Sequence, residues 1–138
     1  MTQKDKDLLL QDLSARLPYS VKGVVTFHKN MTETREEVRI IDGKLYDRFA
    51  KFQDSWYDNV TIKPYLFPLP SMTDEQKQEY TYIVNYISSD DTDNWKEGEF
   101  IYVEQFSQLL HFYHINHLDW RGLIPMGLAN DATGLNIY

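Results

Sequence analysis

Three histidines near the C-terminal end of the chain are the side chains best suited to bind a metal ion. His111, His114 and His117 recur at a spacing of three, and three imidazoles with a water could form an open zinc site. On an ideal helix, however, steps of three residues rotate by about 300° each, so His111 and His117 diverge by roughly 120°. No carboxylate stands at the offset found in an HExxH motif. We therefore predict no metal site and no cofactor; His111 and His114 read as surface residues, and His117 as a residue that caps the helix end or bonds to backbone.

The densest cluster of polar and aromatic residues follows these histidines. It consists of Asp119, Trp120, Arg121 and Gly122. Asp119 could cap a last short helix whose first turn holds the next three residues, and Arg121 could stack on Trp120 or pair with a carboxylate. Because Trp and Arg are also favoured in binding hot spots, the cluster is either a structural anchor or a partner-binding site.

Aromatic residues in the front half of the chain form a second candidate surface. Their density exceeds what the core of a small sheet or barrel requires, although such residues more often fill a core. Taking both surfaces together, we predict the partner-binding residues Tyr46, Phe52, Trp56, Tyr57, Asp119, Trp120 and Arg121.

The sequence lacks the familiar catalytic motifs. Serine nucleophile elbows, phosphate-binding loops and glycine-rich dinucleotide fingerprints are all missing. The chain contains no cysteine, which excludes thiolate metal sites and cysteine nucleophiles. The paired carboxylates Asp90 and Asp91 stand in a polar stretch and are poor acid–base candidates. We therefore predict that the protein is not an enzyme and assign no catalytic residue.

Charge and hydropathy bear on the partner and the compartment. The formal net charge is −7, whereas nucleic-acid binders normally carry a basic patch. A local basic stripe in the front half still leaves nucleic acid as an alternative partner; it would comprise Lys22, Lys29, Lys44, Arg48, Lys51 and Lys63. No apolar run approaches the roughly 20 residues that span a bilayer, and the N-terminal stretch has no apolar core of a signal peptide. We expect a cytoplasmic protein without membrane association.

The front half of the chain is patterned for β-structure. A short amphipathic helix is predicted over residues 5–17, in which Asp12 and Arg16 form an i,i+4 pair. Strands are predicted within residues 20–66, including residues 37–40 and, most clearly, residues 59–66. Asp42-Gly43 predicts a hairpin turn, after which Leu45 and Tyr46 begin the return strand.

The back half is patterned for helices. Three prolines between residues 62 and 76 mark the junction. Thr73 is a good N-cap and Gln76 completes a capping box, and an apolar stripe of Tyr80, Ile83, Val84 and Ile87 follows. A second helix, over residues about 100–116, carries the stripe Tyr102, Phe106, Leu109, Leu110 and Tyr113.

These patterns predict an α+β fold. We expect a small antiparallel β-sheet or SH3-like barrel with an N-terminal helix, packed against two or three C-terminal helices. A chain of 138 residues suits a single compact domain. Residues 1–70 would form its helix plus β lobe and residues 71–138 its helical lobe.

Three stretches of the chain carry distinctive wording: DLSARLPY at 12–19, IKPYLFPLPSMT at 62–73, and HLDWRGLI at 117–124 followed by GLA at 127–129. Together they resemble the signature of a family of small uncharacterised proteins from gut Bacteroidales, commonly encoded among prophage and mobile-element genes. Residues 24–60 offer no match to the family, and NDATG at 130–134 stands where a Glu-Ala-Pro-like tail is typical. The family carries no assigned activity, so the resemblance implies a genetic context and no catalytic residue.

The function we predict is that of a non-enzymatic accessory protein of phage or mobile-element origin in Bacteroides. It would act by protein–protein binding, as a monomer or small homo-oligomer. Two alternatives remain open at this point. One is a nucleic-acid-binding small-barrel protein, and the other is a metal-dependent enzyme using His111, His114 and His117.

Overall fold

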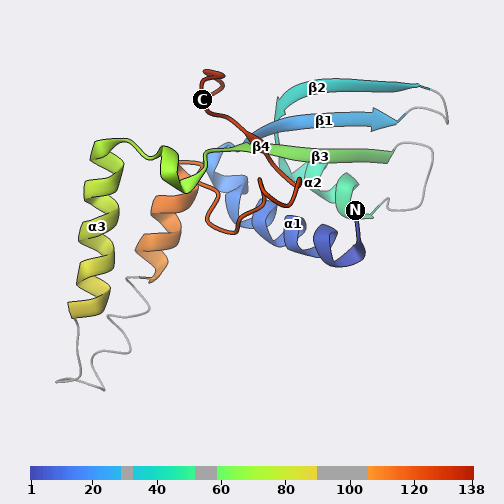
Figure 1. Cartoon of the computed structure of the whole chain (residues 1–138). Coiled ribbons are helices and arrows are strands. Elements are labelled where there is room, and N and C mark those ends of the chain that lie inside the picture. Colours follow the sequence, from blue (N-terminus) through green and yellow to red (C-terminus); the bar gives the residue numbers. More distant parts are fainter. Residues whose placement is uncertain (29–32, 52–58, 90–105) are drawn as a thin grey trace.

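The structure is a computed structural model of the chain and describes residues 1–28, 33–51, 59–89 and 106–138 (Figure 1). Its helices are α1 (Gln3–Arg16), α2 (Gly43–Lys51), α3 (Asp74–Ser89) and a helix over residues 106–115. Its strands are β1 (Lys22–His28), β2 (Thr34–Ile40), β3 (Asn59–Leu66) and β4 (Asn130–Asp131). The predicted α+β class is confirmed.

The four strands form one open, mixed sheet in the order β2-β1-β3-β4. β1 pairs antiparallel with both β2 and β3, whereas β4 pairs parallel with the end of β3. The prediction of an SH3-like barrel is therefore wrong, because the sheet does not close on itself. Helices α1 and α2 cover one apolar face instead, and that cover stabilises so small a sheet without closure.

The predicted hairpin at Asp42-Gly43 is also wrong. Asp42 is the residue before α2, where its Oδ1 accepts a hydrogen bond from the Leu45 amide (2.9 Å). Its carbonyl accepts one from the Tyr46 amide (3.0 Å), which closes the first helical turn. Leu45 and Tyr46 thus lie in a helix and not in a return strand. Asp followed by Gly suits a helix start as well as a tight turn, and the buried pair Leu45 and Phe49 has helical spacing.

The main core lies between the sheet and the helices α1 and α2. The apolar spacing predicted for residues 5–17 is confirmed, since Leu9 and Leu13 of α1 are fully buried. They belong to one cluster with Val25 and Ile62, which project from the same face of the sheet. Alternate residues of β1 and β3 therefore point into this core, as the twofold side-chain period of a strand requires.

A second, smaller core joins α3 to the helix over 106–115, which Figure 1 shows side by side. The predicted capping box is confirmed: the Thr73 amide donates to Gln76 Oε1 (2.9 Å), and the Gln76 amide donates to Thr73 Oγ1 (3.2 Å). Ile83 packs with Phe112 and Tyr113.

The stripe predicted for the second helix is only partly right. Leu109 and Tyr113 pack in the smaller core, but Phe106 and Leu110 are exposed and Tyr102 lies outside the described residues. The packing face is instead completed by Phe112. The helix has apolar residues on more than one side, so their spacing alone could not select the buried face.

The proline-rich junction connects the two cores as the sequence predicts. It continues β3 into a 3-10 turn (Leu69–Ser71) and then α3. Phe67 also pairs with the segment after the last helix: its amide donates to the His117 carbonyl (2.8 Å), and its carbonyl accepts from the Asp119 amide (2.8 Å). No helix within the described ranges is long and apolar enough to cross a membrane.

Candidate functional site

Two stretches far apart in the sequence, residues 12–19 and 117–124, meet at a buried polar corner. Asp12 and Arg16, both fully buried on α1, form an ion pair of 2.7 Å between Oδ2 and Nε. Arg16 Nη2 also donates to the carbonyl of Leu118, far along the chain (2.7 Å). Arg121 brings its Nε to 3.3 Å from Asp12 Oδ1. The i,i+4 pair predicted from the sequence is thus confirmed, and it anchors α1 to the C-terminal segment.

Asp119 works as a local cap within this corner. Its two carboxylate oxygens accept hydrogen bonds from the amides of Leu123 (2.8 Å) and Ile124 (2.9 Å). The last short helix expected there is absent from residues 116–138, which form turns and the short strand β4. A side chain that is almost fully buried and hydrogen-bonded to nearby backbone amides is a structural anchor.

Trp120 and Arg121 pack on the corner as the sequence suggested. The Arg121 guanidinium lies 4.3 Å from the centre of the Trp120 ring. The indole also stacks on Tyr113, with ring centres 5.8 Å apart and planes inclined by 13°. Both side chains are partly exposed, so a rim of this corner reaches the surface.

The histidines each have a separate structural partner. His111 is exposed, as predicted, and its Nδ1 lies 2.9 Å from the Tyr19 hydroxyl. His114 is buried, which corrects the expectation of a surface residue, and its Nε2 accepts from the indole of Trp120 (3.2 Å). Within the described ranges, no three His, Cys, Asp or Glu side chains are placed to hold a metal ion.

His117 ends the helix, as predicted. Its φ of 54° is left-handed. Its amide donates to the carbonyl of His114, and the next amide, of Leu118, donates to the carbonyl of Tyr113. This pattern is a Schellman motif with His117 at the position that glycine usually takes. The His117 ring stacks on Tyr138 with centres 3.6 Å apart, which offers a reason for an aromatic side chain there.

Burial sets the protonation of these histidines. Desolvation lowers the pKa of His114 to about 4, with the Arg16 and Arg121 charges acting in the same direction. Desolvation likewise lowers the pKa of His117 to about 4, helped by Arg16 and Lys22. Both imidazoles are therefore neutral at pH 7, and a neutral Nε2 on His114 is what accepting the Trp120 proton requires.

Of the other predicted binding residues, the structure describes only Tyr46. Tyr46 lies on α2, partly buried against the main core, while Phe52, Trp56 and Tyr57 lie outside the described residues. The aromatic sheet face expected from the sequence is not found in β1, β2 or β3, whose outward side chains are mostly aliphatic or polar.

A further candidate surface is the side of the sheet turned away from α1 and α2, which no described helix covers. We call it the outer sheet face, and it comprises Val24, Thr26, Glu36, Val38, Ile40, Thr61, Lys63 and Tyr65. Val38 is 57% exposed and Ile40 is 53% exposed. Val38 lies directly opposite Val24 on the neighbouring strand. The sequence does not point to this face, because the alternation of charged and apolar residues at 37–40 is typical of a strand with one buried side.

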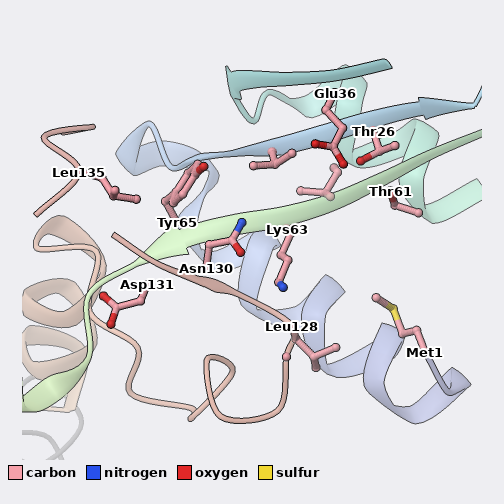
Figure 2. A pocket seen from close by; sticks show the side chains of 13 residues that line it. Met1, Thr26, Glu36, Thr61, Lys63, Tyr65, Leu128, Asn130, Asp131 and Leu135 are labelled. Atoms are coloured by element: carbon pink, nitrogen blue, oxygen red, sulfur yellow. The ribbon is translucent and has the colours of Figure 1, made fainter. Parts of the chain in front are cut away.

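A pocket of about 620 Å³ opens along the β3 side of the outer sheet face. Figure 2 shows Lys63 extending from β3 toward the C-terminal segment that carries Leu128 and Asn130, which also line the pocket. Lys63 and Glu36 form no ion pair with another described residue. The pocket therefore offers both charge signs beside hydroxyls of Thr26 and Thr61.

The basic residues of the front half do not line up. Lys22 and Lys63 project from the outer side of the sheet, while Lys44, Arg48 and Lys51 lie on α2, which covers the opposite side. Lys29 lies outside the described residues. In addition, the Arg48 guanidinium lies over the Phe27 ring at 5.5 Å.

Comparison with known proteins adds no relative. No protein-family model, curated protein or solved structure matches the chain.

Proposed function

We propose that the protein is a non-enzymatic binding module that contacts another protein through its outer sheet face. The observation that carries this proposal is the exposure of Val38 and Ile40 beside Val24 on a sheet face that no described helix covers. Burying such side chains against a partner is favourable by about 25 cal/mol for each Å² of apolar surface removed from water. Contiguous exposed apolar side chains rimmed by polar ones are typical of protein interaction sites.

The polar groups of the corner support a structural role and not catalysis. Asp12, Arg16 and Asp119 are buried and spend their hydrogen bonds on backbone and on one another. His114 and His117 are held in ring contacts. None of these five residues lines the pocket beside β3. A binding role also agrees with the family resemblance, from which we infer a cytoplasmic accessory protein of phage or mobile-element origin.

A protein partner is favoured over nucleic acid by the charge of the outer sheet face. Lys63 and Glu36 oppose each other in sign there, and Lys22 lies at its edge. The chain as a whole carries −7. Phosphate binding needs several converging cations, and the basic residues of α2 lie on the other side of the sheet.

The test is an affinity capture from a Bacteroides lysate with two matched variants. Thr61→Glu with Lys63→Glu places new carboxylates on the outer sheet face. Lys4→Glu with Gln11→Glu makes the same change in net charge on the exposed side of α1. We expect one protein retained by the wild type and the α1 variant but lost by the outer-face variant, with or without nuclease.

Two results would refute the proposal. A partner retained equally by both variants would move the site away from the outer sheet face. Retention that disappears after nuclease treatment would replace the protein partner with nucleic acid.

A further inference from the structure

Strand β2 is a free edge of the sheet. It pairs with β1 along its whole length and has no strand neighbour on its other side among the described residues (Figure 1). All of its side chains are exposed except that of Glu37, which is half-buried. An exposed edge strand presents a row of unpaired N–H and C=O groups to another strand.

The charges along β2 alternate in sign on one side of the strand. Arg35, Glu37 and Arg39 share the side of β2 that faces α2. The Glu37 carboxylate forms an ion pair with each arginine: Oε1 lies 3.0 Å from Arg35 Nε, and Oε2 lies 3.4 Å from Arg39 Nε. On the opposite side, Glu36 is followed by Val38 and Ile40. Charged residues commonly protect edge strands from pairing, but a strand carrying both signs can be complementary to a second copy of itself.

Symmetry limits how two such strands could pair. In an antiparallel pair, residues directly opposite each other point to the same face of the sheet. A two-fold axis perpendicular to the sheet must therefore pass next to one residue of β2. That residue then lies directly opposite the same residue of the second copy. The registers that use most of β2 are centred on Glu36, Glu37 or Val38, and they pair residues 34–38, 34–40 or 36–40 respectively.

Only one of these registers avoids like charges in opposition. Centring on Glu36 places Glu36 against itself. Centring on Glu37 places Glu37 against itself and Arg35 against Arg39. Centring on Val38 places Val38 against itself and Glu37 against Arg39 at both ends of the symmetric pair. Opposite-charge cross-strand pairs stabilise a sheet and like-charge pairs destabilise it.

We propose that two copies of the chain associate through β2, antiparallel and centred on Val38, to form one continuous sheet across a two-fold axis. The interface is isologous, so each copy supplies Glu37 and Arg39 to the other. The two outer sheet faces then lie on the same side and bring Val38 and Ile40 of both copies together. The proposal is tested separately from the proposed function, whose variants change β3 and α1 and leave β2 intact.

The size of the interface predicts a weak, concentration-dependent dimer. The paired segment spans residues 36–40 in each copy, which is small beside interfaces that bury about 1,200–2,000 Å². Sedimentation velocity of the full chain from about 1 µM to about 1 mM therefore covers the range in which the dimer should appear.

The absence of native cysteine allows a direct test of the register. Opposed residues in an antiparallel pair have Cα atoms about 4.5–5.5 Å apart, within the range that a disulfide spans. We expect the Val38→Cys variant to form a disulfide-linked dimer under mild oxidation. The matched Glu36→Cys variant should stay unlinked, because its two copies would lie about 13 Å apart, four residues along the strand.

Charge variants test the same register without a cross-link. Arg39→Glu should weaken dimerisation at least tenfold, and adding Glu37→Arg should restore it by exchanging the two signs. Arg35→Glu, with the same change of charge on the same strand, has no charged residue opposite it and should have a smaller effect. Because all three side chains reach solvent, circular dichroism should show unchanged folding.

Three outcomes would overturn the proposal. The first is a monomer at every concentration, and the second is equal linkage of the Val38→Cys and Glu36→Cys variants. The third is linkage of Glu36→Cys alone, which would place the axis at Glu36 and contradict the charge argument.

Discussion

Replacing Asp12 with alanine should destabilise the protein strongly. Asp12 and Arg16 are both fully buried, and the carboxylate also faces Arg121 at 3.3 Å. The substitution leaves one buried guanidinium without its counter-charge. Removing one partner of a buried pair costs about 3–5 kcal/mol, a large part of the roughly 5–15 kcal/mol that holds such a domain folded.

Urea unfolding followed by circular dichroism measures this loss. With a slope of about 1.5–2 kcal/mol per molar urea, the midpoint should fall by about 2 M. The double variant Asp12→Leu with Arg16→Met removes both charges and fills the space with apolar atoms. It should lose only about 1–3 kcal/mol, since the carbonyl of Leu118 is then the main group deprived of its partner.

The ordering of the two variants is the decisive part of this prediction. If Asp12→Ala shifts the midpoint by less than about 0.5 M, the pair is not buried in solution. If the double variant is no more stable than Asp12→Ala, the cost does not come from an uncompensated charge. Either result would refute the description of the polar corner.

Two further predictions concern pH and packing. The pKa values of His114 and His117, near 4, lie below the 6.5 of an exposed histidine, so the unfolded chain binds more protons between these values. The free energy of unfolding should therefore be highest above pH 6.5 and fall as the pH drops toward 4. Denaturant titrations at several pH values should show that His114→Gln reduces the number of protons taken up on unfolding in this range by about one. Gly23→Ala should lower stability by about 1–3 kcal/mol, because an added Cβ would lie 2.8 Å from the carbonyl oxygen of Lys63. A thermal melt equal to wild type would show that β1 and β3 are further apart than described.

Features set by neighbouring residues could be predicted from the sequence. The capping box of Thr73 and Gln76 is a local motif, and β3 was found because its alternation is regular and its ends are marked. Asp42-Gly43 misled the prediction because the same two residues suit a tight turn and a helix start. Only the burial of Phe49 against the distant α1 cluster distinguishes the two.

Features set by distant contacts could not be predicted. The sequence indicates that Asp12 and Arg16 pair, but it does not show that Leu118 and Arg121 complete their surroundings. The burial of His114 likewise depends on Trp120 folding back onto the helix. The outer sheet face could not be predicted, because a strand with one covered side shows the same alternation of apolar and polar residues whichever face the helices cover.

The measurement that tests the central claim most directly is the affinity of the captured partner for purified variants. Calorimetric titration should show binding at least tenfold weaker for Thr61→Glu with Lys63→Glu than for wild type. The Lys4→Glu with Gln11→Glu variant, with the same net charge, should bind like wild type. Equal affinity of all three proteins for the partner would contradict a binding site on the outer sheet face.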